Sequence, residues 1–335
     1  MNRSIPIKER WKMDNEMMFY FNMESRTLPM ILGGAVGDAL GVPVEYRPRD
    51  SYTITDMTGY GTYQQPIGTW SDDTSLTMCL IESILQKENA NGLLKRFQDY
   101  LENGYWTPDG YAFDIGISTK KAIDRFKKGI SAEKCGGIEE YDNGNGALMR
   151  ISPLVPMLSQ VFDIDRKVKR IEEVCYITHR HPRSTLACII YIQFMTMLFN
   201  NNDKFKAYYE IAQWVKKYAN TGVYERELPH FQRFTEGSLH HLRRDSIHSD
   251  GYVVHTLEAA LWCFLKHDTY KKVVLEAVNL GGDTDTVSFI AGTMAGLYYK
   301  MEGIPIEWTM KLKKIDELKD KCKEFCEFIT KEFYG

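Results

Sequence analysis

The sequence has little of the pattern that β-strands produce. Alternation of apolar and polar residues is confined to a short stretch, YTITDM, near residue 52. No GxGxxG follows a predicted strand, which excludes the usual dinucleotide-binding fingerprint. These absences argue against a fold built on a sheet and predict an all-α protein.

Long apolar runs are also missing. The segment LPMILGGAVG meets Asp38 after ten residues, short of the roughly 18 that a membrane span needs. The segment MNRSIPIKERWKMDNEMMFYF at the start has no continuous apolar stretch of the kind found in a signal peptide. We therefore expect a cytoplasmic protein that does not associate with membranes.

Neither sign of charge dominates the sequence. Lys and Arg number 42 against 45 Asp and Glu, for a net charge of −3, so no stable nucleic-acid partner is expected. Seven cysteines form no CxxC pair, and their odd number favours reduced thiols over a disulfide framework. Cys322 and Cys326 lie one helical turn apart, but no second pair completes a zinc site.

Most of the chain shows helical periodicity instead. Apolar faces extend over several turns in residues 76–86, 185–199, 205–218 and 256–267, and residues 307–333 are amphipathic. We expect residues 1–26 to be an N-terminal extension and residues 27–335 to form one domain, because the chain contains no Pro/Gly/Ser-rich linker.

Two of the expected helices have small residues at every fourth position. Gly33, Gly37 and Gly41 recur in one, and Ala291, Gly292, Ala295 and Gly296 are placed likewise in the other. Glycine costs a helix about 1 kcal/mol relative to alanine, so the close approach of another backbone is a plausible compensation. The pattern predicts two central, tightly packed helices.

Two clusters of carboxylates with hydroxyls precede apolar helical segments. The first contains Ser71, Asp72 and Asp73, and the second contains Asp283, Asp285 and Thr286. One such cluster is most simply a helix cap. Two of them supply the hard oxygen ligands that suit one or two Mg²⁺ or Mn²⁺ ions, although their spacing in sequence does not show that they meet.

Three further features each have an ordinary and a functional interpretation. Glu45, just after Pro43, is either a solvated glutamate or part of a site. The turn Asn143–Gly146 is either a tight loop or a cradle whose amides bind phosphate. His179 is either an ordinary surface or core histidine or a functional one.

Five motifs, in this order, resemble the ADP-ribosylglycohydrolase family: GGAVGDALGVPVEYRP, GTWSDDTSL, GNGALMRISPL, TH at 178–179, and GGDTDTVSFIAGTMAG. The likeness runs from about residue 29 to residue 300. It implies a compact all-α fold and a site for two Mg²⁺ or Mn²⁺ ions that cleaves ADP-ribose from proteins or small molecules.

The resemblance also assigns residues. It implies that the metal ligands are Ser71, Asp72, Asp73, Asp283, Asp285 and Thr286, with Ser71 in place of the family's usual threonine. It implies that the ADP-ribose pocket is lined by Gly144, Asn145, Gly146 and His179. The segment DGYVVHTLEAALWCF also resembles a family segment near the ligand, without an assigned role.

For the reaction, the resemblance points to carboxylates beside the scissile bond. Glu45 is the first candidate for the base that takes a proton from the attacking water, and Asp142, a looser match, is the second. The acceptor (arginine, serine, an acetyl ester or another group) is not determined by these motifs. The alternatives are an inactive ADP-ribose-binding or structural member and a different metal-dependent nucleotide hydrolase.

Overall fold

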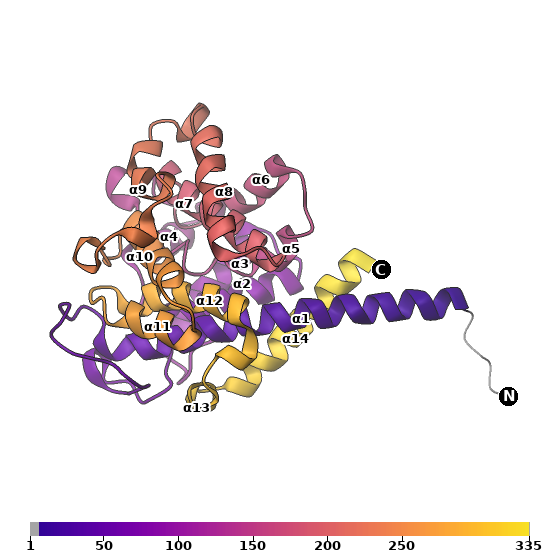
Figure 1. Ribbon diagram of the computed structural model, residues 1–335, viewed down its shortest axis with the longest axis horizontal. Coiled ribbons are helices and arrows are strands. Elements are labelled where there is room, and N and C mark those ends of the chain that lie inside the picture. Colours follow the sequence, from indigo (N-terminus) through magenta and orange to yellow (C-terminus); the bar gives the residue numbers. More distant parts are fainter. Residues whose placement is uncertain (1–6, 335) are drawn as a thin grey trace.

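The computed structural model describes residues 7–334 and confirms the all-α prediction (Figure 1). Within that range there is no β-strand, only isolated bridges, and the YTITDM stretch is irregular. The α-helices are α1 (Ile7–Gly41), α2 (Asp72–Leu85), α3 (Ala90–Asn103), α4 (Ile117–Lys127), α5 (Leu154–Leu158), α6 (Ile164–Cys175), α7 (Pro182–Phe199), α8 (Lys204–Tyr218), α9 (Gln232–Thr235), α10 (Val253–Lys266), α11 (Tyr270–Val278), α12 (Thr284–Gly303), α13 (Ile306–Lys311) and α14 (Ile315–Tyr334). Short 3₁₀ helices are η1 (Val42–Val44), η2 (Gly61–Tyr63), η3 (Ala132–Lys134), η4 (Glu140–Asp142), η5 (Gly222–Tyr224), η6 (Leu228–Phe231), η7 (Leu239–His241) and η8 (Arg244–Ser246).

The central pair of helices is α1 and α12, as the small residues predicted. A methyl group placed on Gly33 would lie 2.5 Å from the carbonyl oxygen of Gly292. A methyl group on Gly37 would likewise overlap the backbone of Ser288. The Ser288 hydroxyl uses the same proximity to donate a hydrogen bond to the Gly37 carbonyl, at 2.6 Å. The glycines are therefore required by contact between two backbones.

α1 continues through the expected domain boundary at residue 26. Figure 1 shows it as a long helix whose N-terminal part projects from the body, with α14 running beside it. The expected boundary thus falls inside a helix and is not marked by a loop. Cys322 and Cys326 are free and buried on α14, and all seven cysteines are unbridged.

The last amphipathic segment is interrupted. Residues 307–333 form α13 and α14, because Leu312 is extended and Lys314 adopts a positive φ of 49°. A left-handed residue cannot continue a right-handed helix.

Two described helical segments are long and apolar enough to cross a membrane, namely Asn15–Val44 and Pro182–Phe199. In the fold, the apolar windows of these segments are 94% and 89% buried, respectively. The expectation from the sequence rested on runs without any charged residue, whereas these two helical windows are apolar on average. Both windows are covered by the rest of the molecule.

Candidate active site

The packing of α1 against α12 brings the two acidic clusters together. Thr284 begins α12, and its hydroxyl donates a hydrogen bond to the carbonyl of Gly41 at the end of α1, at 2.8 Å. The first cluster reaches the same place at the start of α2. The Thr286 hydroxyl lies 3.3 Å from Oδ2 of Asp73, 213 residues away in sequence. The clusters that sequence spacing left apart are therefore in contact.

Two groups of carboxylates are close enough to share a cation. Oxygen atoms of Asp38, Asp73 and Asp285 all lie within 4.8 Å of one another, as do those of Glu45, Asp283 and Asp285. Asp285 belongs to both groups, as a carboxylate bridging two ions would. Buried oxygens Oε2 of Glu45 and Oδ1 of Asp73 have no hydrogen-bond partner in the described part of the chain. Unpaired, buried carboxylate oxygens are the donors that a hard cation requires.

Burial makes this concentration of carboxylates electrostatically costly. It raises the pKa of Asp72, Asp73 and Asp285 well above the usual value, and neighbouring carboxylates raise it further. Desolvation, followed by the charges of Asp114 and Asp283, raises the pKa of Glu45 to about 8. Positive charge is what would relieve this repulsion, so the donor set and its electrostatics both suit a divalent cation.

At the start of α2, the first cluster forms a helix cap and also contributes Asp73 to a group of carboxylates that could bind a cation. Ser71 caps the helix by accepting a hydrogen bond from the Asp73 amide at 3.4 Å, and its hydroxyl donates to Oδ2 of Asp73 at 3.0 Å. Asp38, from α1, accepts hydrogen bonds from the Ser71 amide and from the amide and hydroxyl of Thr74. These three hydrogen bonds hold the start of α2 in place, and the Asp38 carboxylate also lies within reach of the Asp73 and Asp285 oxygens.

Glu45 and Asp114 face the site from two different loops. Glu45 is 3% exposed, so it is not a solvated surface residue. The Tyr63 hydroxyl interacts with both carboxylates and the Tyr46 hydroxyl with Glu45, which partly offsets the rise in their pKa. Asp114 was not predicted from the sequence. It lies in FDIGIST, just before the helix α4, whose first residues line the same cavity, and this position is the feature that could have indicated it.

Asp142 lies elsewhere. Its Oδ2 accepts a hydrogen bond from the Glu139 amide at 3.1 Å, closing a capping box around η4. A methyl group on Gly137 would overlap the same carboxylate. Asp142 is not among the residues that line the cavity described next. The structure thus brings Glu45 to the acidic clusters but uses Asp142 to hold a turn.

A cavity of about 440 Å³ opens above the acidic clusters. It is lined by Glu45, Asp72, Asp114, Asp283 and Thr286, and by Gly144, Asn145, Gly146 and His179, among others. Asn145 joins the two sides of the cavity, because its amide donates to Oδ2 of Asp283 at 2.8 Å and to the hydroxyl of Thr256 at 3.0 Å. Thr256 gives the DGYVVHTLEAALWCF segment a place at the site.

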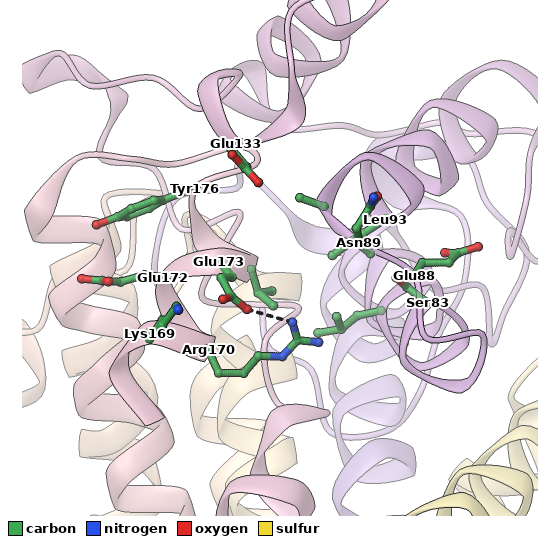
Figure 2. Close-up of a pocket in the computed structure, with 13 residues that line it drawn as sticks. Ser83, Glu88, Asn89, Leu93, Glu133, Lys169, Arg170, Glu172, Glu173 and Tyr176 are labelled. Carbon is green, nitrogen blue, oxygen red and sulfur yellow. Dashed lines mark hydrogen bonds and ion pairs between the residues drawn. The ribbon is translucent and has the colours of Figure 1, made fainter. Parts of the chain in front are cut away.

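A second cavity, of about 420 Å³, lies between α6 and the α2–α3 connection (Figure 2). Its charged residues are mostly satisfied: Arg170 pairs with Glu173 at 3.1 Å, and Glu88 pairs with Arg96 at 2.7 Å. Neither of the two carboxylate groups described above lies there. The first cavity is therefore the candidate active site.

Comparison with known proteins identifies the family. The family model for ADP-ribosylglycohydrolase matches residues 22–334. The chain belongs to the ADP-ribosylglycohydrolase family. By membership it is a hydrolase of glycosyl bonds, in line with the names of its curated relatives.

Relatives within the ADP-ribosylglycohydrolase family cover most of this chain. ADP-ribosylarginine hydrolase Tri1 of Serratia proteamaculans (strain 568) is 29% identical over 300 residues, which span 88% of this chain and 77% of that protein. ADP-ribosyl-(dinitrogen reductase) glycohydrolase of Rhodospirillum rubrum is 29% identical over 297 residues, spanning 87% and 91%. A solved structure described as an ADP-ribosylglycohydrolase-related protein complex matches with a TM-score of 0.74 and 28% identity, over 91% of this chain and 98% of that one.

Proposed function

We propose that this protein hydrolyses the glycosidic bond between ADP-ribose and an acceptor, releases free ADP-ribose, and uses two divalent cations, Mg²⁺ or Mn²⁺. The observation that carries the proposal is the convergence of two acidic clusters beneath one cavity, with an unpaired buried oxygen on Glu45 and another on Asp73. Family membership supplies the reaction class.

The cations would be held by Asp73, Asp283 and Asp285, whose oxygens belong to the two groups of carboxylates. The resemblance adds Ser71, Asp72 and Thr286, and of these Asp72 and Thr286 line the cavity. The chemistry that bound cations supply here is neutralisation of the carboxylates and polarisation of the ribose hydroxyls. Asn145 keeps Asp283 oriented, and Asp38 keeps the start of α2 in place. These two side chains position the carboxylates without needing to contact the substrate.

Glu45 is the proposed base. Its carboxylate faces the cavity, where it can take a proton from a water molecule beside the ribose. Asp114 lies close enough for the charges of the two groups to interact, and its carboxylate can stabilise the positive charge that develops on the ribose as the glycosidic bond breaks. Asp142, the second candidate for the base from the sequence, does not line the cavity.

We also propose arginine as the acceptor and Tyr141 as a contact for the adenine. Two curated relatives are named ADP-ribosylarginine hydrolase. Glu45 and Asp114, the lining carboxylates that are not assigned to the cations, face the cavity together with one lysine, Lys121, which suits a guanidinium leaving group. Tyr141 lines the cavity and is 99% exposed, so its ring is free to stack on a base.

The test is to incubate the manganese-loaded protein with ADP-ribosylated arginine and identify the products. Release of ADP-ribose is expected, and it should disappear with a chelator. Release of AMP would instead identify a phosphoanhydride hydrolase, and metal-dependent binding without turnover would identify an inactive member. Glu45→Gln should lower kcat at least 100-fold, whereas the matched variant Asp142→Asn should stay near the wild-type rate. Equal rates for the Glu45→Gln and Asp142→Asn variants would show that Glu45 is not the base.

A further inference from the structure

A fully buried arginine sits behind the cavity without a carboxylate partner. Arg150 is 0% exposed, and within residues 7–334 no carboxylate lies in ion-pair range of it. Its Nη2 donates to the carbonyl of Val174 at 3.1 Å and to the hydroxyl of Thr178 at 2.7 Å, and the guanidinium lies over the ring of Phe97. Burying an unpaired charge lowers the stability of the fold, so the position of Arg150 beside Thr178 points to a functional role.

The hydroxyl of Thr178 connects this arginine to His179. Thr178 Oγ1 lies 2.8 Å from Nδ1 of His179, and both residues are buried. Arginine can only donate hydrogen bonds, so Oγ1 accepts from Arg150 and keeps its own proton to donate. Among the described residues, Nδ1 of His179 is the remaining partner of this hydroxyl. If Nδ1 carried a proton, the buried hydroxyl hydrogen would have no acceptor.

The imidazole is also held neutral. Burial, followed by the positive charge of Arg150, lowers the pKa of His179 to about 3. A neutral imidazole has one proton, and accepting at Nδ1 places that proton on Nε2. Nε2 faces the glycine turn of the cavity: a methyl group on Gly144 or Gly146 would lie 3.6 or 3.5 Å from it.

We propose that Arg150 and Thr178 act as positioning residues that fix His179 as the Nε2–H tautomer, so that it presents a hydrogen-bond donor to an acceptor oxygen of the bound ligand. The identity of that ligand as ADP-ribose rests on the proposed function. The tautomer itself is a property of the free protein. Arg150 donates to the Thr178 hydroxyl, so this hydroxyl in turn donates its own hydrogen bond to His179, and this is the role of the buried arginine.

The first test is the tautomer in the ligand-free protein, measured from the ¹⁵N shifts and long-range ¹H–¹⁵N couplings of labelled histidine. His179→Gln assigns the signals among the eight histidines. The expected result is an unprotonated Nδ1 and a protonated Nε2. A protonated Nδ1, or a doubly protonated ring at pH 7, would overturn the proposal whatever the protein binds.

The second test is a pair of variants at the hydroxyl. Thr178→Val keeps the shape of the side chain but removes the hydroxyl, so the His179 signals should move towards a mixture of tautomers, and the affinity for ADP-ribose should fall roughly five- to tenfold. Thr178→Ser should restore both. A Val variant with unchanged tautomer and affinity, or a Ser variant that fails to restore them, would contradict the proposal.

The two tests separate this inference from the proposed function. If wild-type protein with metal does not bind ADP-ribose at all, the proposed function fails while the tautomer measurement still stands on its own. If Thr178→Val does not fold, as judged by its circular dichroism spectrum, the tautomer of the wild-type protein and of the Ser variant decides the matter.

Discussion

Replacing Glu45 by glutamine should stabilise the metal-free protein. The pKa of Glu45 is raised from 4.5 to about 8, so the folded state holds its proton more tightly than the unfolded state does. Stability from this group is therefore full below pH 4.5 and is lost as pH rises towards 8. Each pH unit in that interval costs about 1.4 kcal/mol, which gives about 3 kcal/mol at pH 7. Glutamine removes this cost because it never ionises.

The assay is urea unfolding of wild-type protein and Glu45→Gln with a chelator present, at pH 5 and pH 7. At pH 7 the variant should be more stable by about 3 kcal/mol, and at pH 5 by less than about 1 kcal/mol. Glu225→Gln, at an exposed site, should change neither value. Added Mn²⁺ should narrow the difference by stabilising the wild-type carboxylates. A variant that is equally or less stable at pH 7, or a difference independent of pH, would refute the reasoning.

Three further predictions follow from burial and contact. The pKa of His179 is lowered to about 3, so the folded protein does not take up the proton that the unfolded chain accepts below pH 6.5. The free energy of unfolding should therefore fall by about 2 kcal/mol at pH 5. The His179→Gln variant should lack this dependence of stability on pH, and an unchanged dependence would contradict the reasoning. Gly33→Ala puts a methyl carbon 2.5 Å from the Gly292 carbonyl oxygen, so it should lower the free energy of unfolding by about 1–3 kcal/mol and lower the melting temperature. Gly116→Ala is the control, because its methyl group would meet nothing closer than 3.8 Å. Equal melting temperatures for the two variants would argue against close packing of the two backbones. Tyr141→Ala should weaken ADP-ribose binding by about 1–3 kcal/mol in titration calorimetry but leave ribose 5-phosphate unaffected, and equal losses for both ligands would exclude stacking on the base.

The sequence predicted the all-α fold and its central pair of helices because both depend on local pattern. Helical periodicity and the scarcity of alternation act over a few turns, and small residues every four positions mark a face where backbones touch. The break between α13 and α14 was missed, because an amphipathic pattern continues across residues 312–314, where the extended Leu312 and the left-handed Lys314 interrupt the helix.

The candidate site was predicted only in part, because its geometry depends on contacts between distant segments. Asp73 and Asp285 were chosen for their residue types, but their meeting requires α1 to lie along α12. Asp38 and Asp114 were missed because each is a single acidic residue, and a lone carboxylate is usually solvated. Asp142 was chosen as a loose match to the family pattern, whereas its carboxylate turns towards the Glu139 amide.

The most direct test of the account is calorimetric titration of ADP-ribose into three samples: manganese-loaded protein, metal-free protein, and the folded double variant Asp73→Asn, Asp285→Asn with manganese present. We predict one binding site per chain in the first sample and loss of binding in the other two, because both clusters hold the cations that the ligand requires. Equal affinity in all three samples would contradict it, since the acidic clusters would then play no part in binding.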